Sequence, residues 1–229
     1  MDRPTQLPVT APRPPAARLQ PWLLRPAAKV TVFVLSMLPF AWLLRGVTLT
    51  ALGGAVLGAN PAETLIRATG DWTLRFLCIT LAVTPVRELT GQAALARWRR
   101  MLGLFTFFYG VVHFLCYSWL DMSLVLGDIV HDIAKRPFIL VGTSALVLMS
   151  PLAATSFNRA IKTLGSARWR ALHRLVYACA LLGLLHFFWM RSAKRNYAEV
   201  GIYAAVLAVL LGWRVVRRLR SGAGSGART

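Results

Sequence analysis

The chain has few acidic residues and no cysteine motif. Eight Asp and Glu stand against 27 Lys and Arg, which gives the 229 residues a formal net charge of +19. The three cysteines, Cys78, Cys116 and Cys179, lie singly inside apolar runs. Their spacing excludes c-type haem attachment and a zinc site by motif. The sequence also lacks a Gly-rich nucleotide fingerprint and a Ser/His/Asp arrangement, so we expect another protein to carry out any nicotinamide oxidation.

This basic charge coexists with a strongly apolar composition. Hydrophobic residues make up 56% of the chain, charged residues 15%, and the mean hydropathy is +0.55. A soluble domain is usually close to half apolar and about a quarter charged. A water-soluble nucleic-acid binder therefore does not explain the composition. A polytopic membrane protein does, because its apolar helices are joined by basic loops.

Six apolar segments have the length of membrane-spanning helices, which need about 20 residues with some tolerance. They are Lys29–Arg45, Trp72–Val86, Leu102–Leu120, Phe138–Thr155, Ala171–Met190 and Ala198–Val216. The second is short and carries Arg75, so it begins earlier or is tilted. A further apolar stretch, Val47–Ala59, is short and rich in glycine, and we expect it in an outer loop or at the membrane interface. The predicted fold is all-α, a six-helix transmembrane bundle.

Proline and charge divide the chain into three parts. Residues 1–28 hold seven prolines among several arginines, which predicts a mostly disordered basic tail. Residues 29–218 form the membrane domain, and residues 219–229 form a short flexible tail. Of the 27 Lys and Arg residues, 19 fall in the tails and in the loops on the same side as the tails. The positive-inside rule makes that side, with both termini, cytoplasmic.

Two of the four histidines lie level inside the predicted membrane segments. From the cytoplasmic side, His113 lies about 20 Å deep and His186 about 22 Å deep, at 1.5 Å per residue. A polar side chain at that depth is costly unless it has a partner. Two level imidazoles on separate helices suit axial ligation of a haem iron, and the alternative is a hydrogen bond between two helices. His131, beside Asp128 and Asp132, is expected to be a solvated loop residue.

The remaining histidine, His173, lies near the cytoplasmic edge. It precedes His186 by 13 residues, which places the two about 140° apart on an ideal helix. The level position on the third segment is Arg100, which cannot ligate iron. A second haem would need another ligand or an open position. The alternatives are a flavin or quinone head group, helped by Arg174, and a histidine that only lies at the interface.

Other residues suit the binding of a large flat cofactor. Arg75, near the outer end of the second segment, is the candidate partner of the outer haem's propionates, and Arg100 and Arg174, at the cytoplasmic edge, are candidates to bind the propionates or phosphate of an inner cofactor. Gly103, Gly110 and Gly183 would let such a cofactor or a neighbouring helix approach closely.

Several motifs together resemble one known family. They are Arg99-Arg100-Met101-Leu102-Gly103-Leu104 followed by Tyr109 and His113, Trp169-x-x-Leu172-His173-Arg174-Leu175-x-Tyr177, His186-Phe187-x-Trp189, Gly58-Ala59-Asn60-Pro61, Thr84-Pro85 and Arg136-Pro137-Phe138. Between Lys29 and Arg218 the chain resembles the MsrQ family, formerly YedZ, the haem-binding membrane subunit of the periplasmic methionine sulfoxide reductase system. That family belongs with the ferric reductase-like transmembrane domains.

The resemblance implies a b-type cytochrome of the bacterial inner membrane, with one or two haems and FMN. It would pass electrons from the quinone pool, or from a cytoplasmic flavin reductase, to a periplasmic molybdopterin-containing subunit that repairs methionine sulfoxide in proteins. The chain would be an electron-transfer subunit without a sulfoxide-reducing site of its own. The family's histidine positions correspond to His113, His173 and His186. The rival functions are a non-redox membrane anchor or assembly subunit, and a stand-alone ferric reductase-like protein.

Overall fold

The computed structural model of the chain describes residues 22–192 and 197–225, and these residues form helices and turns without a β-strand. The elements are α2 (Pro26–Ala51), α3 (Pro61–Thr90), η1 (Ala93–Leu95), α4 (Ala96–Cys116), η2 (Tyr117–Asp121), α5 (Leu126–Lys135), α6 (Pro137–Ala154), α7 (Asn158–Leu164), α8 (Ser166–Leu172), α9 (Leu175–Ser192) and α10 (Ala198–Ser225). Residues 1–21 of the predicted first tail, and residues 226–229 of the second, lie outside the described residues.

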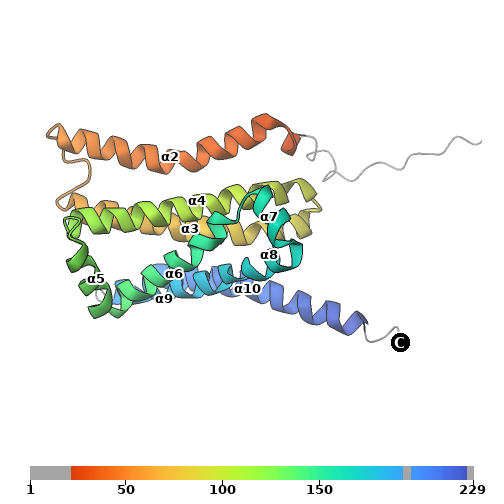
Figure 1. Cartoon of the computed structure of the whole chain (residues 1–229). Coiled ribbons are helices and arrows are strands. Elements are labelled where there is room, and N and C mark those ends of the chain that lie inside the picture. Colours follow the sequence, from red (N-terminus) through yellow and green to blue (C-terminus); the bar gives the residue numbers. More distant parts are fainter. Residues whose placement is uncertain (1–21, 193–196, 226–229) are drawn as a thin grey trace, which may run out of the picture.

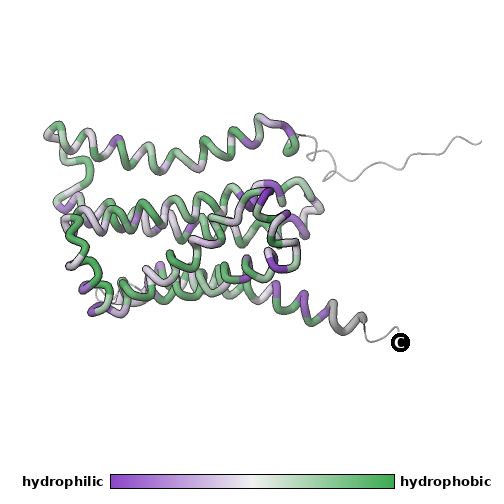
Figure 2. Tube along the Cα trace, viewed as in Figure 1, coloured by the Kyte–Doolittle hydropathy of each residue, from purple (hydrophilic) through white to green (hydrophobic). Residues whose placement is uncertain are grey.

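Six long helices, α2, α3, α4, α6, α9 and α10, run along a common direction, and α2 is set apart on one side (Figure 1). Helix α5 lies at one end of this bundle, and α7 and α8 lie at the other, where both described ends of the chain also lie (Figure 1). Apolar residues fill the middle, and hydrophilic residues gather at the α7–α8 end (Figure 2). The prediction of an all-α membrane bundle is confirmed.

Five of the predicted spans correspond to helices long and apolar enough to cross a membrane. The helix that holds the remaining span, α3, begins at Pro61, well before the predicted Trp72, as the short apolar segment and Arg75 allowed. Its first turns carry Glu63, Arg67 and Asp71, which lower its mean hydropathy.

The stretch Val47–Ala59 is divided between a helix and a turn. Helix α2 continues through its first five residues to Ala51, where an outer loop or a segment at the membrane interface had been expected. The chain then folds back so that the Leu57 side chain packs against Gly46. A Cβ added to Gly46 would stand 2.8 Å from Cδ2 of Leu57. Gly53 and Gly58 adopt φ values of +94° and +79°, which glycine tolerates without strain. The helix therefore ends where close packing and these glycines reverse the chain.

Tyr109 of α4 connects α2 to the bundle. Pro39 lies inside α2, and a proline there disturbs the helical hydrogen bonds. The buried Tyr109 hydroxyl donates to the Ser36 carbonyl at 2.8 Å and accepts from the Phe40 N–H at 3.0 Å. It thus bridges two α2 backbone groups that would otherwise pair with each other. Tyr109 also stacks on Phe76 of α3, with ring centres 5.2 Å apart.

Arg214 of α10 compensates for a second internal proline. Pro85 in α3 has no N–H, so the carbonyl of Leu81, four residues earlier, loses its usual helical partner. The Arg214 guanidinium donates to that carbonyl at 2.5 Å and to the Leu210 carbonyl at 2.6 Å. It also lies over the Tyr177 ring of α9, 5.7 Å from its centre.

We expect Arg214→Ala to destabilise the bundle by about 1–3 kcal/mol, because it leaves the Leu81 carbonyl without a partner in an apolar environment. Thermal unfolding in detergent, followed by circular dichroism, measures the effect. The matched control is Arg220→Ala, which removes an exposed arginine near the end of the same helix. Equal melting temperatures for the two variants would contradict this role of Arg214.

Candidate functional site

A cavity of about 460 Å³ lies among α3, α4, α6 and α9, and we call it the His113–His186 cavity. It extends toward the α5 end of the bundle, where Tyr117 and Asp121 of η2 line it. Two of the glycines that the sequence singled out, Gly110 and Gly183, also line it.

The two histidine rings face one another across this cavity. Their centres are 6.1 Å apart and their planes are inclined at 72°. A metal–imidazole bond is about 2 Å long, and the ring nitrogen lies about 1 Å from the ring centre, so two imidazoles on one metal have centres about 6 Å apart. The spacing therefore fits a single metal ion shared by His113 and His186.

The hydrogen bonds of both rings leave the same nitrogen free. Nδ1 of His113 lies 2.8 Å from the Ile66 carbonyl, and Nδ1 of His186 lies 2.6 Å from the Phe138 carbonyl. A carbonyl only accepts, so each Nδ1 carries the proton and donates. Nε2 then keeps its lone pair, and a backbone carbonyl on the other nitrogen is the usual support of a metal-binding histidine.

Two glycines provide the space for these rings. A Cβ on Gly142 of α6 would stand 2.7 Å from Nδ1 of His186. A Cβ on Gly70 of α3 would stand 3.1 Å from Cε1 of His113. Sequence reasoning did not single out either glycine, because a glycine opposite a histidine on another helix leaves no local pattern.

The ligand set favours haem over a metal held by protein alone. Within the described parts of the chain, no group of three or more His, Cys, Asp and Glu side chains is placed to hold a metal ion. Two imidazoles without further protein ligands suit an iron whose other positions a porphyrin occupies. The residues present therefore fit a bis-histidine haem.

The arginines that line the His113–His186 cavity do not include Arg75, which the sequence suggested. Arg67 and Arg136 line it, paired with carboxylates one helical turn away at 2.6 Å and 2.8 Å. Arg75 is not among the lining residues, and it bonds to the Tyr203 hydroxyl at 3.3 Å and lies over the Trp72 ring.

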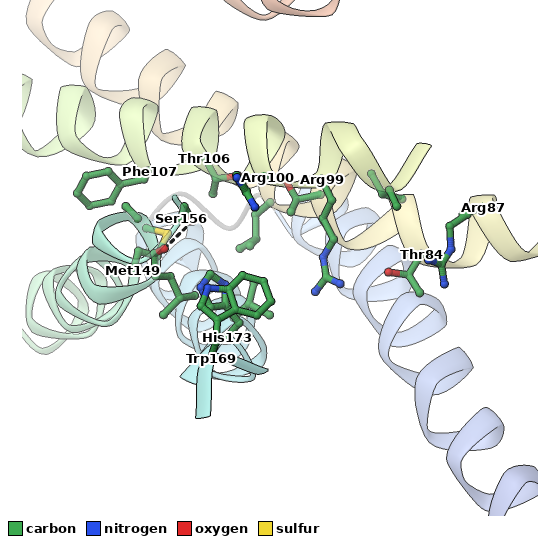
Figure 3. A pocket seen from close by; sticks show the side chains of 18 residues that line it. Thr84, Arg87, Arg99, Arg100, Thr106, Phe107, Met149, Ser156, Trp169 and His173 are labelled. Carbon is green, nitrogen blue, oxygen red and sulfur yellow. Dashed lines mark hydrogen bonds between the residues drawn. The ribbon is translucent and has the colours of Figure 1, made fainter. Parts of the chain in front are cut away.

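A second cavity, of about 320 Å³, opens toward the α7–α8 end, and we call it the His173 cavity (Figure 3). Three arginines line it, Arg87, Arg99 and Arg100, and none of its lining residues is acidic. Arg174 is not among them. Leu77 and Met149 line both cavities, so the two are neighbours within the bundle.

His173 lies in a break of the predicted fifth span. Helix α8 ends at Leu172 and α9 begins at Leu175, with hydrogen bonds of the i→i+3 type across the junction. The angle of about 140° to His186 that an ideal helix would give therefore does not apply. Nε2 of His173 lies 3.1 Å from the Thr155 hydroxyl, and the Trp169 ring stacks on the imidazole with centres 4.0 Å apart.

Comparison with known proteins agrees with this architecture. Residues 69–184, which include His113 and His173, match the family model described as "Ferric reductase like transmembrane component". The chain is 64% identical over 196 residues to a "Protein-methionine-sulfoxide reductase heme-binding subunit MsrQ" of Polaromonas naphthalenivorans, covering 86% of this chain and 87% of that protein. It is 54% identical over 203 residues to a protein of the same name in Ralstonia nicotianae, covering 87% and 91%. No solved structure matches.

The similarity covers most of this chain and most of each relative. The chain belongs to the MsrQ family, within the ferric reductase-like transmembrane proteins.

Proposed function

We propose that this chain is a membrane b-type cytochrome that carries electrons across the bacterial inner membrane to a periplasmic molybdopterin-containing reductase of protein methionine sulfoxide. The observation that carries the proposal is the pair His113 and His186, whose rings lie 6.1 Å apart with Nδ1 of each bonded to a backbone carbonyl. The curated relatives are named as haem-binding subunits of such a system.

His113 and His186 would be the axial ligands of the haem, which supplies a one-electron redox centre when bound. The carbonyls of Ile66 and Phe138 hold the imidazole tautomers, and the Phe138 ring stacks on His186 with centres 6.0 Å apart. These contacts would keep both imidazoles oriented toward a shared iron.

Haem propionates need cationic partners at the mouth of the cavity. Arg67 and Arg136 are the arginines that line it, and Arg75 stands nearby on α3, packed on Trp72. Arg67 and Arg136 each bond to a carboxylate, so a propionate would join an existing ion pair. We propose these two arginines, with Arg75 as the third candidate.

The His173 cavity would hold the group that delivers electrons to the haem. Its arginines, Arg87, Arg99 and Arg100, can bind an anionic edge, and Arg174 lies in the turn next to His173. FMN, a quinone and a second haem are the chemistries that the sequence left open. The quinone pool, or a cytoplasmic flavin reductase, would be the donor.

The distribution of polar residues supports the proposed orientation. Hydrophilic residues gather at the α7–α8 end of the bundle, where both described chain ends lie (Figure 2). Under the positive-inside rule that end would be cytoplasmic, and the His113–His186 cavity would lie toward the periplasm. A periplasmic partner would therefore meet the α5 end.

Reoxidation of the haem tests the proposal. We expect the purified chain, reduced with dithionite, to show b-type absorption bands that disappear when the periplasmic molybdopterin-containing subunit and a methionine sulfoxide substrate are both added. Omitting the sulfoxide is the control. Colourless protein from haem-replete cells would favour a non-redox anchor, and NADH oxidation by the isolated chain would favour a self-contained ferric reductase.

A further inference from the structure

We infer that α5 is an interfacial helix, whose uncovered apolar side inserts among the lipid acyl chains at its end of the bundle. That side carries Leu126 and Val130, and it adjoins Leu124 and Val125 of the preceding turn. We call these four residues the α5 apolar patch. All four are exposed, Leu126 at 73% and Val130 at 59%. Apolar side chains that gather on a surface mark a contact with another molecule or with a membrane.

The sequence of α5 separates apolar from polar residues. At about 100° per residue, its four large apolar residues fall within an arc of about 100°, and its four polar or charged residues fall within a similar arc on the opposite side. The apolar residues are Leu126, Ile129, Val130 and Ile133, and the polar or charged residues are Asp128, His131, Asp132 and Lys135. A helix of this pattern is stable where its whole apolar arc is removed from water.

The bundle covers only half of the apolar arc. Ile129 is buried in a cluster with Tyr117 and Ile139, and Ile133 packs against the same cluster. Leu126 and Val130 occupy the other half of the arc, and their exposure shows that the described part of the chain does not cover them. The α5 apolar patch therefore needs an occupant from outside the fold.

The opposite edge of α5 is fixed to the bundle. Asp132 is buried, and its carboxylate accepts from the Tyr117 hydroxyl at 2.7 Å and pairs with Arg136 at 2.8 Å. Tyr117 and Arg136 both line the His113–His186 cavity. These contacts hold α5 in one orientation, so the α5 apolar patch cannot turn inward.

The α5 apolar patch continues the exposed side of a membrane-spanning helix. Leu115 and Trp119 lie four residues apart near the end of the span Ala93–Asp121, and both are exposed. The Leu124 N–H donates to the Ser118 carbonyl at 2.8 Å, which brings the patch next to Trp119. A spanning helix meets lipid on its exposed side, and tryptophan concentrates where the hydrocarbon ends. The patch therefore begins at the membrane interface.

Two further features favour lipid over a protein as the occupant. Helix α5 runs across the end of the long helices (Figure 1), as an amphipathic helix in the plane of a membrane interface does. The patch is wholly aliphatic, which suits acyl chains, whereas protein interfaces are enriched in aromatic residues, Met and Arg. Asp128, His131 and Lys135, on the other side of α5, are exposed and would remain in water, where a periplasmic partner could reach them.

Spin labels on the two sides of α5 test the inference. The full-length chain carries Cys116→Ala and keeps the buried Cys78 and Cys179. A nitroxide is attached at Leu126→Cys or Val130→Cys, and the chain is reconstituted into vesicles of phosphatidylethanolamine and phosphatidylglycerol. Power-saturation electron paramagnetic resonance measures collisions of the label with oxygen, which concentrates in hydrocarbon, and with a nickel chelate, which stays in water.

The matched controls are Asp128→Cys and Lys135→Cys, on the polar side of the same helix. We expect the ratio of oxygen to nickel accessibility to be at least about threefold higher at Leu126→Cys and Val130→Cys than at the controls, because an interfacial helix buries its apolar side below the headgroups. Circular dichroism of each labelled chain checks that its helices are intact.

Two results would overturn the inference. Equal ratios on the two sides of α5 would place the α5 apolar patch in water. Low accessibility to both reagents at Leu126→Cys and Val130→Cys, with an immobilised spectrum, would show that protein covers the patch, as in a dimer of this chain. The measurement does not depend on bound haem, so a failure of the proposed function would leave it unaffected.

Discussion

Replacing His113 or His186 by Ala is expected to abolish the reduced b-type absorption bands of the purified chain. Each variant removes one of two imidazoles whose centres lie 6.1 Å apart, and no third His, Cys, Asp or Glu joins them in the described part of the chain to form a metal-binding group. The remaining histidine could hold iron on one side only. Haem content per chain, measured by pyridine haemochrome assay, should fall by about tenfold or more, since one axial bond contributes several kcal/mol.

The control is His131→Ala, which removes an exposed histidine from α5. Its haem content should equal that of the wild type. Circular dichroism separates loss of haem from loss of fold, because the helical signal should persist in all three variants. Unchanged haem in purified His113→Ala or His186→Ala would show that the pair only joins two helices.

Gly142→Ala is expected to have nearly as large an effect without touching a ligand. The added Cβ would stand 2.7 Å from Nδ1 and 2.8 Å from Cε1 of His186, closer than such contacts occur in proteins. The imidazole must move, and its hydrogen bond to the Phe138 carbonyl, on the same helix as Gly142, is the contact that breaks. We expect most haem to be lost, with an altered electron paramagnetic resonance spectrum for any that remains.

Two other glycines provide a graded comparison. Gly70→Ala places its Cβ 3.1 Å from His113, so we expect a smaller loss of haem. Gly183→Ala meets nothing closer than Leu77 at 4.0 Å and is the matched control, since it too lines the cavity. Alanine favours a helix over glycine by up to about 1 kcal/mol, so none of these variants should weaken its helix. Equal haem loss in Gly142→Ala, Gly70→Ala and Gly183→Ala would contradict the expectation that the added Cβ of Gly142→Ala displaces the His186 ring.

The pairing of His113 with His186 could be predicted from the sequence because depth in a membrane depends on little besides residue count. Each residue of a helix rises 1.5 Å, and basic residues mark where each helix leaves the bilayer. Two residues at similar distances from such marks must be level. In the structure the centres of the His113 and His186 rings lie 6.1 Å apart.

The arginines around the cavities could be predicted only in part. The sequence suggested Arg75, Arg100 and Arg174. Arg100 lines the His173 cavity with Arg87 and Arg99, whereas Arg67 and Arg136 line the His113–His186 cavity and Arg75 and Arg174 line neither. Which way a side chain points depends on the rotation of its helix about its own axis. In a helix that is apolar all round, no amphipathic pattern reports that rotation.

The ends of the predicted helical segments also differ from the structure in two places. The stretch from Val47, expected in an outer loop or at the interface, is helical to Ala51, and the chain then folds back so that Leu57 packs against Gly46, 11 residues earlier. The predicted fifth span is broken at His173, where Thr155 and Trp169 hold the imidazole. Both departures result from contacts across the fold, which composition does not report.

The sequence by itself determined the membrane class, most of the helical segments and the level positions of His113 and His186 on two of them. All of these follow from the cost of placing polar groups in hydrocarbon, which acts on each residue separately. Only the tertiary structure decided the helix rotations and the hydrogen-bond partners, and with them the tautomers. Those depend on pairs of residues far apart in the chain, such as His113 with Ile66 and His186 with Phe138.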